Sequence, residues 1–98
     1  MIINIESSPI RSKRFRIYFL DGSRMDIGNS KRLDEYIDTG NKYDRETYYR
    51  SMDMTDRREF SRMRPSRVVL ESYLLNGPTT NVIKNINYAN ETLFDFLF

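Results

Sequence analysis

The 98-residue sequence contains no cysteine, no histidine and no tryptophan. Without cysteine the chain forms no disulfide, and without cysteine or histidine it lacks the ligand sets typical of zinc sites. The same absences exclude a thiol nucleophile and an imidazole base. No run approaches the roughly 18 apolar residues of a membrane span. The opening MIINIESSPIR lacks the pattern of a signal peptide, so we expect a soluble protein of a reducing compartment.

The length favours one domain. Hydrophobic residues make up 39% of the chain and charged residues 31%, so the core has few residues to draw on. Seven tyrosines and six phenylalanines must supply much of it, because each ring buries a large area. This composition favours a compact α+β domain, or a protein that completes its core against partners.

The net charge of +2 is small, but its distribution is uneven. Residues 1–67 hold 15 Lys or Arg and 11 Asp or Glu, whereas residues 68–98 hold one Lys and three acids. The excess of positive charge has two centres. The first contains Arg11, Lys13, Arg14 and Arg16, and the second contains Arg57, Arg58, Arg62, Arg64 and Arg67.

Residues 13–27 have the pattern of a β-hairpin. From Lys13 to Leu20, apolar residues alternate with cationic or hydroxyl-bearing ones, as in a strand with one apolar face. A two-residue Asp-Gly loop would mix polar and apolar side chains on each face. A three-residue loop of residues 20–22, with glycine in the left-handed position, sets Ile17 opposite Met25 and Phe15 opposite Ile27. We therefore predict the three-residue loop.

Three or four short helices are expected after the hairpin. Ser30 is the expected N-cap of the first, with Leu33, Tyr36 and Ile37 on one face and Gly40 at its end. Asp44 is the expected cap of a second helix over residues 45–52. Ser66 is the expected cap of a third over residues 67–75, closed by Gly77-Pro78. Thr79 or Thr80 is expected to open the last helix. Residues 53–64 are too highly charged for helix and loop to be told apart.

The predicted fold is thus a small single α+β domain over residues 13–91 with an N-terminal hairpin at about 13–27. Residues 1–12 are predicted to be an extended arm or an edge strand, interrupted by Pro9. Residues 92–98 are predicted to be an apolar C-terminal docking tail. The tail either folds back onto this domain's core or inserts into a neighbouring protein, since exposed apolar residues promote aggregation. Its candidate partner-binding residues are Leu93, Phe94, Phe96, Leu97 and Phe98.

The arginines are candidates for binding a polyanion or an acidic partner. The segment 57–67 has five arginines against one acid, Glu59, and is the stronger candidate. Arg14 and Arg16 on the hairpin interleave with aromatic residues, as in single-strand and β-ribbon binders. The reading that we favour makes them the outward polar face of a half-buried hairpin, where Lys and Arg also protect an edge from aggregation.

Nothing in the sequence predicts catalysis. Carboxylate pairs such as Asp34 and Asp38 are one helical turn apart, but solvated helix faces explain them better than a cation site. Serine, threonine and tyrosine are plentiful, yet none has a recognisable base, and there is no glycine-rich phosphate loop. We expect a protein that is not an enzyme and has no catalytic residue, metal or cofactor.

Three blocks, KRFRIYFLDGSRMDIG, YIDTGNKYDRETYYRSM and YLLNGPTTNVIKNI, resemble the ordered blocks of a family of small proteins from nucleocytoplasmic large DNA viruses. The resemblance spans residues 13–86. Family members tend to carry tryptophan where this chain has Phe60 and residues 75–77, and Thr39-Gly40 replaces a polar pair. The family has no established activity, so the resemblance implies none.

The resemblance implies a viral setting. The first function hypothesis is a non-enzymatic structural component of the virion, a minor capsid or internal protein that binds other capsid proteins through its two arms. The second is a small basic DNA- or RNA-binding protein of the virus. A third, weaker hypothesis is a regulator that binds a host protein. The expected location is the virion, with host cytoplasm or viral factory during infection.

Overall fold

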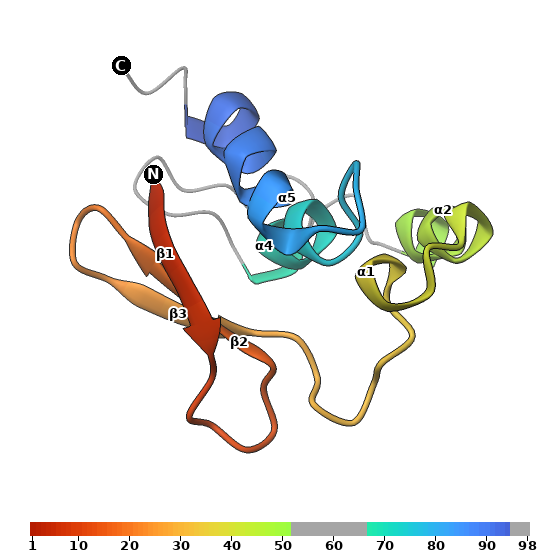
Figure 1. Ribbon diagram of the computed structural model, residues 1–98, viewed down its shortest axis with the longest axis horizontal. Helices are drawn as coiled ribbons and strands as arrows, with labels where there is room; N and C mark the ends of the chain where they lie inside the picture. Colours follow the sequence, from red (N-terminus) through yellow and green to blue (C-terminus); the bar gives the residue numbers. More distant parts are fainter. Residues whose placement is uncertain (52–66, 95–98) are drawn as a thin grey trace.

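The computed structural model describes residues 1–51 and 67–94 (Figure 1). These residues form a three-stranded antiparallel sheet in the order β1-β2-β3, four α-helices and one π-helical turn. The strands are β1 (Ile2–Ser7), β2 (Phe15–Phe19) and β3 (Arg24–Ile27). The helices are α1 (Tyr36–Thr39), α2 (Lys42–Ser51), α4 (Arg67–Leu74) and α5 (Val82–Ala89), followed by η1 (Asn90–Phe94). The predicted α+β class is confirmed.

The β2–β3 hairpin has the predicted register. Phe15 lies opposite Ile27 and Ile17 opposite Met25. Gly22 has φ 87°, and its N–H donates to the Phe19 carbonyl at 3.0 Å, which closes a three-residue loop. One apolar face therefore runs across both strands, because side chains alternate along a strand and a one-residue slip would reverse them.

β1 adds to the free edge of β2, so residues 2–7 take the edge-strand form of the two that we considered for residues 1–12. Ile2 lies opposite Phe19 and Ile5 opposite Ile17, with a register shift between Ile2 and Asn4. Ile2 and Ile5 are three residues apart, and a regular strand would send them to opposite faces. The bulge at Ile3 lets both face the core and leaves Ile3 exposed.

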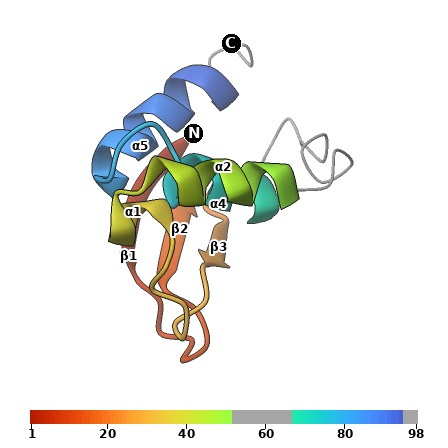
Figure 2. The same ribbon diagram turned by 90° about the vertical axis from the view of Figure 1, so that its right-hand side faces the viewer.

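The core lies between the apolar face of the sheet and helices α4 and α5. Figures 1 and 2 show both helices against one side of the sheet. α1 and α2 lie beyond the C-terminal end of strand β3. In α4, which covers most of the third predicted helix, Val69, Leu70 and Leu74 are buried. Burying a leucine side chain contributes about 1.5–3 kcal/mol. The remaining members of the buried cluster are Ile2, Ile17, Phe19, Ile27, Leu75, Ile86, Ala89 and Leu93.

Three of the predicted helix starts are wrong. α1 begins at Tyr36 and not directly after Ser30. Ser30 caps no helix, because its hydroxyl donates to the Arg11 carbonyl at 2.6 Å. Leu33, expected on the buried face, precedes the helix and is 66% exposed. Gly40 does end α1, with φ 65° in the left-handed region.

Asparagines cap the other two helices. Asn41 Oδ1 accepts from Tyr43 N at 2.9 Å, so α2 begins before Asp44. Asn81 Oδ1 accepts from the N–H groups of Ile83 and Lys84, so the α5 cap lies just after the predicted threonines. Asn and Ser are about equally good N-caps, and tertiary position decides between them. The predicted cap Ser66 and the charged segment 53–64 lie outside the described residues.

Candidate functional site

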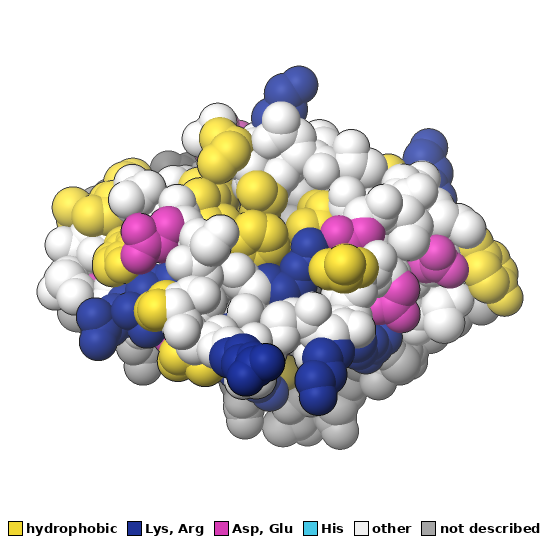
Figure 3. Space-filling view, turned by 60° about the horizontal axis from the view of Figure 1, so that its bottom comes forward, with side chains coloured by type: hydrophobic (Ala, Val, Ile, Leu, Met, Phe, Trp, Pro, Cys, Tyr) yellow, Lys and Arg dark blue, Asp and Glu magenta, His cyan; other side chains and the backbone are white. Residues whose placement is uncertain are grey.

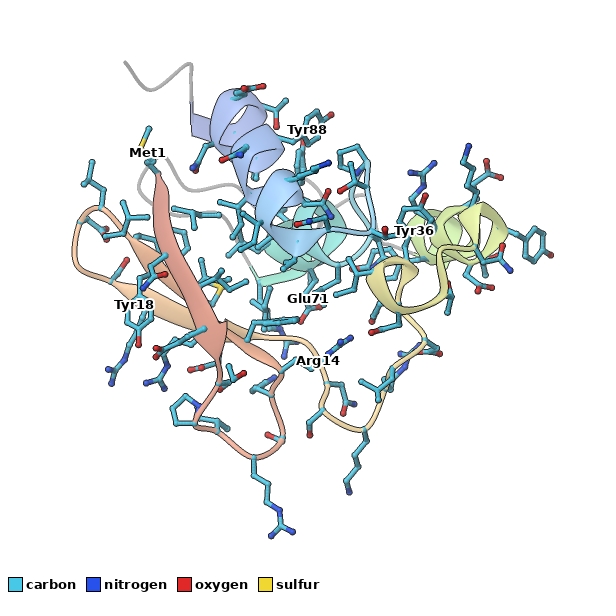
Figure 4. All side chains as sticks on the ribbon, in the orientation of Figure 1. Met1, Arg14, Tyr18, Tyr36, Glu71 and Tyr88 are labelled. Atoms are coloured by element: carbon cyan, nitrogen blue, oxygen red, sulfur yellow. The ribbon has the colours of Figure 1, made fainter. Side chains whose placement is uncertain are left out.

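The outer face of the sheet carries polar side chains that bond to one another. Arg16 Nε contacts Asp26 Oδ1 at 3.0 Å, and Ser8 Oγ donates to the same oxygen at 2.6 Å. The Arg16 guanidinium, together with the Ser8 hydroxyl, holds the pKa of Asp26 below its usual range. On the same face, the Tyr18 hydroxyl (Figure 4) donates to the Glu6 carboxylate, which raises the pKa of the Tyr18 phenol.

Arg14 is held between the sheet and α1. Its two terminal nitrogens each contact one oxygen of Asp38 at 2.8 Å. The Arg14 and Asp38 side chains are only 12% and 19% exposed. Figure 4 shows Arg14 and Glu71 in the space between the sheet and α1. This is the two-pronged geometry in which arginine binds a carboxylate most firmly.

The two hairpin arginines proposed as polyanion ligands are therefore engaged within the molecule. Arg16 is only 13% exposed in its pair with Asp26, which is 14% exposed. A phosphate would have to compete with a carboxylate that is already in place. Arg14 and Arg16 thus lie on the outward side of the hairpin as ion-paired, mostly covered side chains, and the structure shows neither of them free to meet a phosphate.

Positive charge gathers instead on two loops at one end of the sheet. The tripeptide Ser-Lys-Arg occurs twice, at residues 12–14 between β1 and β2 and at residues 30–32 after β3. Ser30 joins the two loops, because its N–H donates to the Ser12 carbonyl at 3.1 Å and its hydroxyl to the Arg11 carbonyl at 2.6 Å. Figure 3, which brings this end of the molecule forward, shows Lys and Arg side chains along its lower part.

Between these loops and the helices lies a cavity of about 500 Å³, which we call the basic groove. Its charged lining residues are Lys13, Lys31, Arg32, Arg67, Glu35 and Glu71. The four cations exceed the two acids, so the lining has a formal charge of +2. Gly28 closes one wall, and its N–H donates to Glu71 Oε1 at 3.0 Å.

The groove cations are only weakly engaged by the acids around them. Arg32 makes two long hydrogen bonds to the Asp34 carboxylate, both at 3.3 Å, and the two side chains are 62% and 63% exposed. Arg67 is 3.9 Å from Glu71. Within residues 1–51 and 67–94, neither Lys13 nor Lys31 forms a salt bridge. Exposed pairs of this kind contribute little, so these cations can turn toward an incoming anion at small cost.

The other candidate residues are placed as follows. Arg67, from the predicted arginine cluster, lines the basic groove. Arg57, Arg58, Arg62 and Arg64 lie outside the described residues. Leu93, expected in the docking tail, is buried in this domain's own core, and Phe94 is the last residue of η1. Phe96, Leu97 and Phe98 also lie outside the described residues.

Lys31 and Arg32 were not among the predicted site residues. The sequence signal for them is the repeated Ser-Lys-Arg tripeptide, which lies at the same end of a three-stranded meander each time it occurs. Lys13 belongs to the first basic centre but was not selected as a ligand. Charge counting along the chain could not find the groove, because its cations come from three separate segments.

The groove's chemistry is that of anion binding. In the described ranges, no group of three or more Asp, Glu, His or Cys side chains lies close enough to hold a metal ion. No helix in the described part of the chain is long and apolar enough to cross a bilayer. No protein-family model, curated protein or solved structure matches this chain.

Proposed function

We propose that this protein is a non-enzymatic nucleic-acid-binding protein that holds a DNA or RNA phosphate backbone in the basic groove. The observation that carries the proposal is the joining of the two Ser-Lys-Arg loops by Ser30, which brings Lys13, Lys31 and Arg32 to one cavity. Lysine and arginine that reach phosphates supply most of the affinity of such proteins, largely without sequence preference.

The resemblance to the viral family supplies the setting of this proposal. The ligand would be the genome or transcripts of a large DNA virus, in the viral factory, the host cytoplasm or the particle. Arg67 lines the basic groove, and the arginines at 57–64 precede it in the chain. The role of the cluster as a polyanion contact stays a prediction.

The test is a salt titration of binding. The full chain is titrated into a fluorescently labelled single-stranded oligonucleotide, and anisotropy gives the dissociation constant at several salt concentrations. Phosphate contacts release counterions, so the logarithm of affinity should fall linearly with the logarithm of salt concentration. Neutralising one groove cation that contacts a phosphate, in Lys13→Gln or Lys31→Gln, should make this negative slope shallower by about 0.7.

Lys84→Gln is the matched control. Lys84 is exposed on α5 and does not line the groove, but its substitution changes the net charge by the same amount. Equal effects of Lys31→Gln and Lys84→Gln would show that only net charge matters. Binding that is absent or insensitive to salt would exclude the proposal.

A second candidate function is the virion structural role, and one described feature favours it. Met1, Ile3 and Leu20 are 41%, 57% and 63% exposed, and Leu20 N donates to the Met1 carbonyl at 2.9 Å. Figure 1 shows the N-terminus and η1, the last described element, on this side of the molecule. A coat protein that covered these apolar residues and the terminal segment would make this chain a minor capsid component.

Because Leu93 is in the core, the clean deletion for this role is residues 95–98 and not 92–98. The deletion and an Ile3→Ser, Leu20→Ser double variant should be lost from purified particles. Exposed Tyr43→Ser serves as the control, because Tyr43 is 70% exposed on α2. Normal incorporation of both altered chains would rule this role out.

A further inference from the structure

The basic groove adjoins a second cavity of opposite character. This cavity has a volume of about 330 Å³ and shares Arg32, Glu35 and Tyr48 with the basic groove. We call it the acidic lobe, because its lining adds Asp34 and Asp44 to Glu35, with Thr47 and Asn76 as neutral polar members. The two cavities together form a site whose lining has a formal charge of +2 in the basic groove and −2 in the acidic lobe, where Arg32 faces three carboxylates, and Tyr48 lines both.

Hydrogen bonds within the fold hold the acidic lobe in shape. Asn76 Nδ2 donates to Glu35 Oε2 at 2.7 Å, and Asn76 Oδ1 accepts from Tyr36 N at 3.2 Å. Asn76 is 1% exposed, so these bonds are shielded from water. The carboxylate of Glu35 is therefore fixed at the boundary between the two cavities, both of which Tyr48 of α2 also lines.

The charge pattern discriminates among polyanions. An acidic peptide, a sulfated sugar or a polyphosphate carries negative charge along its whole length, and Asp34, Glu35 and Asp44 would repel the part that entered the acidic lobe. A nucleotide unit has one anionic group only. Its other parts are a flat ring, hydroxyl groups and, on adenine, cytosine and guanine, an amino group that donates hydrogen bonds to carboxylates.

We propose that the site binds single-stranded nucleic acid, with phosphates in the basic groove, one base against Tyr48 and an amino or hydroxyl donor of that nucleotide in the acidic lobe. This inference depends on the proposed function and names its substrate class. A duplex keeps the faces of its bases stacked inside, whereas a single strand can turn a base outward onto an aromatic side chain.

Figure 3 shows the same division on the surface. Lys and Arg side chains lie along the lower part and centre of this face, and acidic side chains gather mainly toward the side of α2. A strand crossing from the loops to α2 would thus pass from phosphate-attracting to phosphate-repelling surface. A nucleic-acid strand changes in the same way within each nucleotide, from an anionic phosphate to an uncharged base.

The test compares four ligands by anisotropy competition at one fixed moderate salt concentration. They are a single-stranded 12-mer, a 12-mer of the same length without bases, the corresponding duplex and a free mononucleotide. Stacking of one base on an aromatic side chain strengthens binding by about 1–3 kcal/mol, which is about 5- to 150-fold. We expect the single strand to bind at least fivefold more tightly than the baseless strand and the duplex.

Variants of Tyr48 test whether the preference for the single strand depends on this side chain. Tyr48→Leu should remove the preference for the single strand over the baseless strand, and Tyr48→Phe should keep it, because the ring face remains. Tyr43→Leu is the matched control on the same helix, since Tyr43 is exposed and lines neither cavity. Thermal unfolding checks that each variant folds, and the baseless-strand comparison needs no variant at all.

The outcomes separate the two proposals. Equal, salt-dependent binding of the single strand, the baseless strand and the duplex would leave nucleic-acid binding standing and overturn this inference. A free mononucleotide that competes as well as the 12-mer would also overturn it, in favour of a nucleotide pocket. Absence of binding to every ligand would overturn both proposals.

Discussion

Arg14 at the start of the hairpin and Asp38 in α1 form a two-pronged ion pair, with both nitrogen–oxygen distances at 2.8 Å. Asp38 Oδ2 also accepts from Glu35 N at 3.1 Å, so one carboxylate binds the sheet and the first turn of α1 together. Glu35 lies at the boundary of the two cavities, and this pair therefore helps to set the width of the site.

The Arg14–Asp38 pair should contribute measurably to stability. Hydrogen bonds to charged groups that are mostly shielded contribute about 1.5–3 kcal/mol, so Asp38→Asn should lower the free energy of unfolding by roughly that amount. A double-mutant cycle with Arg14→Gln, followed by urea denaturation, isolates the pairwise energy. The same cycle on Arg32 and Asp34, which are 62% and 63% exposed, should give less than about 1 kcal/mol. Equal energies for both pairs would contradict this prediction.

Asp26 should make stability depend on pH in the acid range. Its hydrogen bonds with Arg16 and Ser8 lower its pKa below the ordinary value of 3.8. A carboxyl group with a lowered folded pKa contributes stability that is complete above the unfolded pKa and is lost as the pH falls through the folded pKa. Asp26→Asn should therefore be less stable than the unaltered chain at pH 7, and this difference should shrink below pH 3.8.

Urea midpoints measured from pH 7 down to about pH 2.5 check the Asp26 prediction. Asp34→Asn is the control, since Arg32 also lowers the pKa of Asp34 but both side chains are largely exposed. A constant difference between Asp26→Asn and the unaltered chain across this pH range would count against the assignment.

Gly77 should tolerate no side chain. A Cβ atom at this position would lie 2.1 Å from the Tyr73 carbonyl oxygen and 2.9 Å from Cγ of Asn85. Asn85 is fully buried and donates to the Leu74 carbonyl at 2.9 Å, so the α4–α5 connection has little room to move. We expect Gly77→Ala to lower the free energy of unfolding by about 3 kcal/mol, at the upper end for overpacking.

Gly22→Ala is the comparison for Gly77→Ala. At Gly22 a Cβ atom would meet nothing within 4 Å, and only the positive φ of 87° disfavours it. This costs about 1–2 kcal/mol. Urea denaturation of the two variants should rank Gly77→Ala as the more damaging, and the reverse order would show that the connection can relax.

Asn90 should hold the first strand in place. Its side chain accepts from Ile2 N at 2.8 Å and donates to the Ile2 carbonyl at 3.0 Å, as a neighbouring strand would. Asn90→Ala should release the start of β1 and speed hydrogen exchange at the Leu20 amide, which donates to the Met1 carbonyl. Exposed Asn87→Ala on α5 is the control. Unchanged exchange at Leu20 in Asn90→Ala would refute the role.

Much of the fold followed from local pattern. The hairpin register was predictable because only one pairing keeps Phe15, Ile17, Met25 and Ile27 on one face. The end of α1 was predictable because Gly40 alone nearby adopts the left-handed conformation easily. The starts of the helices were less predictable, because Ser30, Asn41 and Asn81 are chemically similar N-caps. In the folded chain the Ser30 hydroxyl bonds to the Arg11 carbonyl and is not available to cap a helix.

The sequence by itself determined the α+β class, the hairpin, the helix that became α4 and the absence of cysteine and histidine chemistry, since each depends on residue type or on neighbours along the chain. Tertiary structure decided which arginines are engaged. Arg14 finds Asp38 at a separation of 24 residues. The two Ser-Lys-Arg segments extend the β2–β3 pairing, in which Phe15 lies opposite Ile27, and the packed helices bring Tyr48, Arg67 and Glu71 to them. Charges interact through space and not along the sequence, so the position of the basic groove appeared only when the chain was folded.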